Sequence, residues 1–470
     1  MRPLMAATSQ GIGARRSAVT THAGNGARDQ YAPGEFSSYY VPLTMSGSPM
    51  PAPDRPGVTC PFCGLVCDDL RVGPGTRGLA VTENGCAVAA RGFGQVATAT
   101  TGPRIAGAPA TLADAAAAAA RLLAAARRPL IGGLGTDVQG ARAACRLADQ
   151  TGGVLDHMNG AGAIRNLLVL QDSGWITTTL SEIRNRCDLL ILAGGDITSR
   201  FPRFFERTIA APEALFGGDR QCATVFLGRG PQAGVTLPGP VEVIGCEVAE
   251  LGQAFGLLRA LLAGRPVQAT SAAGAPLAVW QGLADRMRAA TYGVVAWAAP
   301  DFDFPHAELA IQTLCELVKD LNRDTRFSGL PLGGSDGDIT VDAVSLWQTG
   351  FGLRAAFGAG GPTQDLHQHA TARLLASGEA DALVWVSSFD PARTPPASTV
   401  PTVVLGHAAM TLPAEPAVFI PVGTPGVDHA GHLFRTDRVV ALPLAALRGS
   451  ALPSVAEALD AIGAALEGGR

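Results

Sequence analysis

Four cysteines between residues 60 and 86 have the spacing of a metal site. Cys60, Cys63, Cys67 and Cys86 follow the pattern Cys-x2-Cys-x3-Cys-x18-Cys. Three closely spaced thiolates can ligate one side of a [4Fe-4S] cluster, and a fourth thiolate after a loop can complete the coordination. A zinc ion also accepts four cysteines, but its usual signature is two symmetric Cys-x2-Cys hairpins. The spacing therefore favours a [4Fe-4S] cluster, with structural zinc or an empty inherited site as the alternatives.

The remaining cysteines stand singly on apolar segments, at Cys145, Cys187, Cys222, Cys246 and Cys315. We expect them to be buried small hydrophobic residues rather than members of a disulfide framework. Together with an iron–sulfur site, this pattern favours a reducing compartment. The sequence therefore predicts a cytoplasmic protein.

The composition is typical of a compact α/β protein. Of the 470 residues, 47% are hydrophobic and only 16% are charged, and this length provides for two or three domains. The formal net charge of −4 offers no basic footprint for nucleic acid and no polybasic patch for a membrane surface. No apolar run approaches the roughly 18 residues of a transmembrane helix. Neither nucleic acid nor a membrane is an expected partner, and the low share of charge favours partner subunits instead.

The cysteines must be positioned by helices and strands. The sequence predicts that helices and strands alternate along the rest of the chain. An Ala-rich helix is expected over residues 111–128, with Thr111 as its N-cap and Pro129 as its stop. An apolar strand and glycine turn follow at 129–137, then a helix over 138–150. Continuous apolar runs, typical of parallel strands covered on both faces, recur at 187–196, 223–228, 241–245, 292–298, 382–387 and 402–406. Amphipathic helices are predicted between them at 250–262, 277–289, 306–322 and 366–375.

This alternation predicts doubly wound sheets, and the number of strands implies more than one. Residues 1–55 are rich in Ser, Gly, Ala and Pro, and we expect a disordered leader there. Residues 56–108 form a predicted Cys-rich domain. Two α/β domains are predicted at 109–265 and 276–470, joined by a linker at 265–275.

The cysteine motif followed by these α/β units resembles the molybdopterin oxidoreductase superfamily. Within it, the chain resembles the B subunit of formylmethanofuran dehydrogenase, and it is most similar to the B subunit of the bacterial formyltransferase/hydrolase complex. The resemblance extends over most of residues 55–445, and it is carried by residues 170–174 (LQDSG), 179–188 (TLSEIRNRCD), 317–322 (LVKDLN) and 345–350 (SLWQTG). It implies a small cluster domain followed by two Rossmann-like doubly wound domains.

The resemblance also implies cofactors and partners. The B subunit of that family carries tungsten or molybdenum, held by two molybdopterin guanine dinucleotides and one cysteine or selenocysteine, beside a [4Fe-4S] cluster. It reduces CO2 to formate, which a partner protein condenses with methanofuran. The bacterial formyltransferase/hydrolase complex is similar but lacks the redox half. Its other members are a zinc amidohydrolase as the A subunit, a C subunit, and a D subunit that transfers the formyl group from tetrahydromethanopterin.

The position of the metal-ligating cysteine separates these two possibilities. An ungapped match places that ligand on Gly162 and the histidine after it on Ala163. Neither side chain can ligate a metal or transfer a proton. We therefore expect a protein without redox activity of its own.

Side chains that the resemblance implies for nucleotide binding are also missing at several positions. The turns at 227–230 and 405–407 lack the carboxylate that the resemblance implies for a guanine or ribose. Asp390 keeps a carboxylate, and this residue is the predicted nucleotide contact. Arg200 and Arg203 could hold a phosphate, although a solvated or interface role is the stronger expectation.

Three functional hypotheses follow from these residues. The leading one is a scaffold within a complex that converts a formyl group to formate. The second is an active tungsten or molybdenum protein with an unusual metal ligand. The third is an electron-transfer protein that uses only the cluster.

Overall fold

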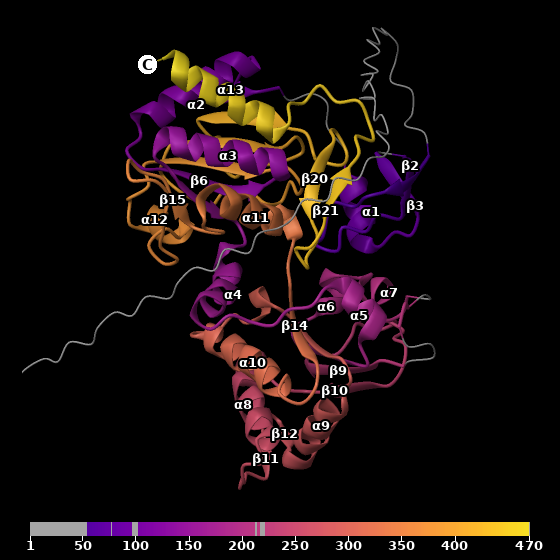
Figure 1. Ribbon diagram of the computed structural model, residues 1–470. Helices are drawn as coiled ribbons and strands as arrows, with labels where there is room; N and C mark the ends of the chain where they lie inside the picture. Colours follow the sequence, from indigo (N-terminus) through magenta and orange to yellow (C-terminus); the bar gives the residue numbers. More distant parts are fainter. Residues whose placement is uncertain (1–53, 77, 96–101, 212–213, 217–220, 470) are drawn as a thin grey trace, which may run out of the picture. The chain divides into compact units, whose positions relative to one another are not determined.

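The computed structural model describes residues 54–76, 78–95, 102–211, 214–216 and 221–469 (Figure 1). The predicted leader, residues 1–55, lies outside this part of the chain except for Asp54 and Arg55. The described residues belong to one compact unit, and the predicted α/β class with parallel sheets is confirmed.

The Cys-rich segment forms a three-stranded antiparallel sheet and one helix. Its strands are β1 (Arg55–Val58), β2 (Leu70–Pro74) and β3 (Leu79–Glu83), and its helix is α1 (Ala87–Phe93). Cys86 is the N-cap of α1, and its thiol accepts the Ala89 amide at 3.5 Å. The Phe62 and Phe93 rings pack edge to face at 5.0 Å. This aromatic pair holds the loop with the first three cysteines against the helix.

The larger sheet has nine strands in the order β16-β15-β7-β6-β17-β18-β19-β4-β5. Its five parallel strands are β6 (Pro129–Gly135), β7 (Val154–His157), β17 (Ala382–Ser387), β18 (Thr402–His407) and β19 (Val418–Val422). Short antiparallel strands extend both edges: β15 (Ala355–Ala356), β16 (Thr363–Gln364), β4 (Arg104–Ile105) and β5 (Ala108–Pro109). One face packs on α2 (Leu112–Ala125), α3 (Val138–Thr151) and α13 (Val455–Gly468). The order of the parallel strands reverses between β6 and β17.

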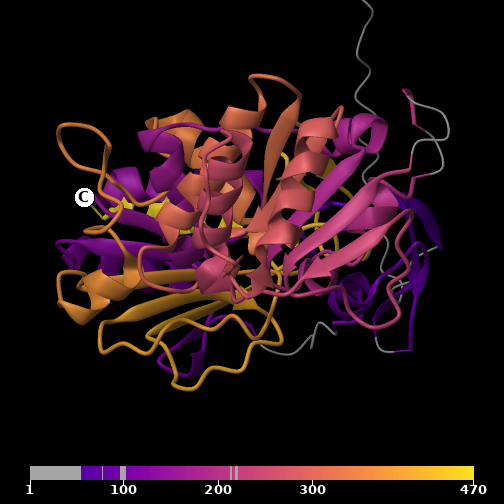
Figure 2. The ribbon, with the colours of Figure 1, turned by 90° about the horizontal axis from the view of Figure 1, so that it is seen from below.

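The second sheet is entirely parallel, with the order β10-β9-β8-β13-β14. Its strands are β8 (Leu189–Gly194), β9 (Ala223–Gly228), β10 (Val241–Ile244), β13 (Gly293–Ala298) and β14 (Phe327–Leu332). One face packs on α8 (Leu251–Leu262), α9 (Leu277–Ala289) and α10 (Ala307–Leu321), which Figure 2 shows in front of the strands. The other face packs on α5 (Leu180–Arg186), α6 (Ile197–Arg200), α7 (Phe204–Arg207) and the Cys-rich segment. Strand order reverses here between β8 and β13.

The sheets divide the chain differently from the predicted domains. The predicted boundary at 265–275 falls inside the five-stranded sheet, because β8 to β10 precede it and β13 and β14 follow it. Those residues contribute a small hairpin, β11 (Ser271–Ala272) and β12 (Ala275–Pro276), and the Trp280 indole donates to the Ala272 carbonyl at 2.8 Å. The chain leaves the larger sheet after β7 and returns to it at β15. The division is set by the pairing of strands that are distant along the chain, and local composition gives no sign of this pairing.

Helix ends depend on contacts outside the helices. The N-cap prediction for Thr111 is confirmed, since its hydroxyl accepts the Asp114 amide at 3.1 Å. The helix ends at Ala125 rather than residue 128, because the Asp381 carboxylate accepts the amides of Arg127 and Arg128. The helix predicted at 366–375 is only α12 (Thr371–Ala376); the preceding residues form a turn around the Asp365 carboxylate.

The remaining elements connect the sheets. They are α4 (Gly160–Asp172), the 3-10 turns η1 (Val248–Glu250), η2 (Ala299–Asp301) and η3 (Ser335–Gly337), α11 (Asp338–Thr349), and the hairpin strands β20 (Gly431–Phe434) and β21 (Ala441–Leu444). In the described part of the chain, no helix combines the length and apolar character needed to cross a membrane.

Candidate functional site

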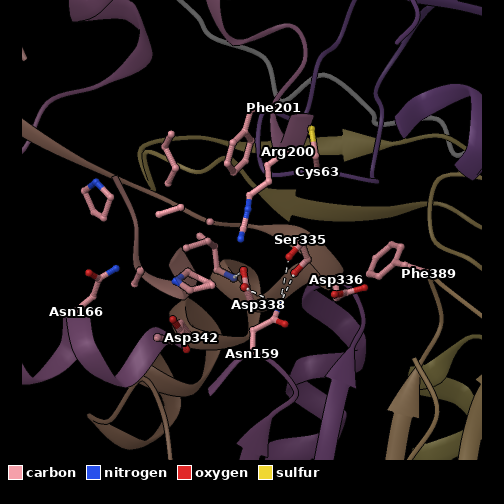
Figure 3. A pocket seen from close by; sticks show the side chains of 18 of the residues that line it. Cys63, Asn159, Asn166, Arg200, Phe201, Ser335, Asp336, Asp338, Asp342 and Phe389 are labelled. Carbon is pink, nitrogen blue, oxygen red and sulfur yellow. Dashed lines mark hydrogen bonds between the residues drawn. The ribbon is translucent and has the colours of Figure 1, made fainter. Parts of the chain in front are cut away.

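A cavity of about 750 Å³ lies where the carboxyl ends of both parallel sheets meet the Cys-rich segment (Figure 3). Its walls include residues that directly follow β7, β8, β13, β14 and β17. In open α/β sheets, ligands bind outside the carboxyl ends of the strands, at the points where strand order reverses. The cavity is therefore the candidate functional site. Side chains that shape it include Phe62, Cys63, Asn159, Arg200, Phe201, Asp336, Asp338, Phe389, Asp390 and Arg393.

A hydrogen-bonded network of four side chains forms one wall of the cavity. Asn159 Nδ2 donates to Asp338 Oδ2 at 2.9 Å, and Asn159 Oδ1 accepts from Arg393. Arg393 also pairs with Asp336 Oδ2 at 3.2 Å. Asp338 Oδ1 accepts the amides of Gly334 and Ile339. The network ties the loop after β14 to the loops after β7 and β17.

Burial dominates the electrostatics of this network. It raises the pKa of Asp338, against the opposing charge of His157, and raises the pKa of Asp336, against the opposing charge of Arg393. Beside them, His157 Nε2 pairs with Asp342 Oδ1 at 3.1 Å. Burial lowers the pKa of His157, but the Asp342 carboxylate outweighs it, and the pKa lies above its usual value.

The two arginines considered for phosphate binding are engaged by carboxylates. Arg200 reaches into the cavity and pairs with Asp301, which also accepts the Gly195 amide at 3.1 Å. Arg203 is buried and donates to both oxygens of Asp69, at 2.7 and 2.8 Å. Arg203 thereby fastens the Cys-rich segment to the helices after β8.

Gly162, which the resemblance places at the metal-ligand position, lies buried in the first turn of α4. A Cβ atom there would lie 2.9 Å from Pro300 Cγ and 3.2 Å from Pro300 Cα. Real Cβ atoms essentially never approach another heavy atom as closely as the first of these distances. Ala163 lines the cavity with a methyl group only. A side chain at position 162 would thus require Pro300, in η2, to shift.

The four cysteines of the motif lie in one part of the fold. Cys60, Cys63 and Cys67 are buried, Cys86 is half-buried, and Cys63 lines the cavity. Burial, with a smaller contribution from the neighbouring cysteines, raises the pKa of Cys63 to about 12. Burial raises the pKa of Cys67 to about 11, against the charges of Arg203 and Arg207. Within the described residues, no three His, Cys, Asp or Glu side chains form a group that could hold one metal ion.

The loop of the cysteine motif is tightly seated beside the cavity. A Cβ atom at Gly64 would lie 1.7 Å from the Gly333 carbonyl oxygen, so only glycine fits there. Gly64 O accepts the Thr436 amide at 2.7 Å, and Thr436 Oγ1 accepts the Gly333 amide at 2.9 Å. The loop is therefore locked to the segment after β14 that also carries Asp336 and Asp338.

The predicted nucleotide contact, Asp390, lines the cavity after β17. Its Oδ1 accepts the Ala392 amide at 2.8 Å, which orients the carboxylate within its turn. Sequence reasoning missed the residues around it: Asn159, Asp336, Asp338 and Arg393. Asp336 has a positive φ of 55° in the Gly-rich turn that follows β14. A Gly- and Asp-rich loop of this kind is the sequence signal that could have indicated these residues.

Comparison with known proteins identifies close relatives. No family model matches the chain. It is 32% identical over 330 residues to the B subunit of the formyltransferase/hydrolase complex Fhc of Methylorubrum extorquens, covering 69% of this chain and 85% of that relative. It is 26% identical over 399 residues to the B subunit of the tungsten-containing formylmethanofuran dehydrogenase 2 of Methanocaldococcus jannaschii, covering 81% and 91%.

A solved structure supports the same relationship. A chain of the formyltransferase/hydrolase complex FhcABCD from Methylorubrum extorquens, crystallised with methylofuran, superposes with a TM-score of 0.65 at 29% identity. The match covers 78% of this chain and 99% of that chain. The resemblance inferred from the motifs is thereby confirmed, and this chain belongs to the family formed by the B subunits of formyltransferase/hydrolase complexes and formylmethanofuran dehydrogenases.

Proposed function

We propose that this chain is the non-redox B subunit of a cytoplasmic formyltransferase/hydrolase complex of one-carbon metabolism. In this proposal it acts as a scaffold that holds a zinc amidohydrolase-like A subunit, a C subunit and a formyltransferase D subunit. The complex converts a formyl group to formate. The relatives named above support membership of such a complex, and the geometry at Gly162 carries the non-redox part.

The tungsten or molybdenum pterin cofactor does not fit the residues present. Gly162 and Ala163 supply no ligand atom, and even a Cβ atom at position 162 would lie 2.9 Å from Pro300 Cγ. At the end of β18, His407 is buried and burial lowers its pKa, so it is a neutral ring at pH 7. Its Nδ1 accepts the Ala409 amide at 3.1 Å. No step of a reaction is therefore assigned to the pterin.

A [4Fe-4S] cluster fits the chemistry of the four thiols. Such a cluster binds each thiolate on a different iron atom, so its ligands need not converge on one point. When bound, it supplies a one-electron centre and a crosslink between the loop and α1. Burial raises the pKa of Cys67 to about 11, and the positive charges of Arg203 and Arg207 beside it partly oppose this rise. We propose Cys60, Cys63, Cys67 and Cys86 as the cluster ligands.

Metal analysis of the co-expressed, purified complex tests this function. We expect substoichiometric tungsten and molybdenum, about four iron atoms per chain, and co-purification with the amidohydrolase and formyltransferase proteins. One tungsten or molybdenum per chain would refute the scaffold and establish the active alternative. A brown monomer that binds neither partner would instead favour the cluster-only electron carrier.

A further inference from the structure

Two buried thiols touch at the amino ends of β8 and β9. Cys222 Sγ lies 3.7 Å from Cys187 Sγ, and the two side chains are 5% and 0% exposed. Both pack in the same hydrophobic cluster, on the face of the five-stranded sheet that carries the Cys-rich segment. Cys145 and Cys315 each belong to a different cluster. The other two buried cysteines thus do not share a cluster with the pair, so burial of a cysteine does not by itself bring two thiols together.

The backbone brings the two residues to the amino ends of neighbouring strands. The Ala223 amide donates to the Asp188 carbonyl at 2.9 Å, and Cys187 and Cys222 each precede one member of this bonded pair. The register pairs Leu189 with Ala223, so Cys187 and Cys222 are offset by one residue along the strands. Their sulfurs nevertheless touch, and a disulfide would shorten this distance from 3.7 Å to about 2.0 Å.

We propose that Cys187 and Cys222 form a reversible disulfide when the protein meets a hydroperoxide. One thiolate attacks the peroxide oxygen, the O–O bond breaks, and a sulfenic acid and hydroxide form. The second thiol attacks the sulfenic sulfur and displaces water. Two thiols and one hydrogen peroxide give one disulfide and two waters, and the two electrons pass from the sulfurs to the peroxide.

The bond would close a loop that contains the anchor of the Cys-rich segment. Residues 188–221 lie between the two cysteines and include α6 and α7. Arg203 and Arg207, in this segment, pair with Asp69 and Asp68 beside Cys67. Because a crosslink lowers the entropy of the unfolded chain, oxidation should stabilise the segment that holds the cysteine motif. The pair is thus a site of oxidative modification, independent of any redox chemistry in the cavity.

Peptide mapping of the folded full-length protein tests the bond directly. The protein is treated with hydrogen peroxide, quenched with catalase, unfolded in N-ethylmaleimide and digested with trypsin without reductant. We expect one linked species that joins residues 187–200 to residues 221–229 and lacks two hydrogens relative to their sum. Recovery of both peptides with maleimide on each cysteine, or with sulfinic acid on either, would overturn the proposal.

Thermal unfolding supplies a second measurement. Oxidation should raise the midpoint temperature of unfolding by about 4 °C. This value is the stabilisation expected from closing the loop between the two cysteines, divided by the unfolding entropy of a chain of this size. Dithiothreitol should reverse the rise. Cys222→Ser should abolish the rise. Cys315 is also buried, on α10, and serves as the control: Cys315→Ser should keep the rise. An equal rise in Cys222→Ser would show that the effect arises elsewhere and would contradict the assignment. The peptide map of the unmutated protein decides the question if a variant does not fold.

Discussion

Replacing Gly162 with alanine measures directly how closed the metal-ligand position is. Glycine to alanine in a helix usually stabilises a protein by up to about 1 kcal/mol. Here the new methyl group would lie 2.9 Å from Pro300 Cγ and 3.2 Å from Pro300 Cα. Overpacking of this kind costs typically about 1 to 3 kcal/mol, because the backbone has to move. We expect Gly162→Ala to lower the free energy of unfolding by about 1 to 2 kcal/mol.

Urea and thermal denaturation check this value against a matched control. Gly256 lies within α8 and a Cβ atom there meets nothing within 4 Å, so Gly256→Ala should stabilise the protein by up to about 1 kcal/mol. The opposite signs of the two changes are the essential result. A Gly162→Ala protein as stable as Gly256→Ala would refute the closure of this position.

Three further predictions concern the cavity wall and the cysteine motif. Arg393→Met removes the ion pair of Asp336, and we expect a loss of about 1 to 2 kcal/mol at pH 8. The loss should shrink at pH 5, because burial raises the pKa of Asp336 and protonation favours the folded state; equal urea midpoint shifts at both pH values would contradict this. Burial raises the pKa of Asp69, but Arg203 outweighs it and the pKa lies below its usual value. Its stabilisation is therefore present above about pH 4 and is lost as the pH falls through the lowered pKa, and Asp69→Asn should flatten this part of the stability curve; an unchanged acid limb would argue against it. Cys67→Ser should remove iron and visible absorption from the purified protein, and retention of both would exclude Cys67 as a ligand.

The strands and their class were predictable because apolar patterning is local. The run at 187–196 and those at 292–298 and 382–387 each contain one observed strand, since continuous apolar residues bounded by glycine or aspartate fit only a sheet covered on both faces. The N-cap at Thr111 is likewise a short-range interaction. Which strands share a sheet was not predictable, because β7 and β15 pair across roughly 200 intervening positions of unrelated composition.

The sequence alone determined the family, and it has Gly162, without a ligating side chain, where the resemblance implies the metal ligand. The cysteine spacing and the missing side chain at Gly162 are both properties of residue type. Only the tertiary structure decided that Pro300 fills the space beside Gly162. It also decided that Arg203 is engaged by Asp69, and that Cys187 and Cys222 touch. Each of these contacts joins segments that are distant along the chain, and their positions depend on how the two sheets pack rather than on any local pattern.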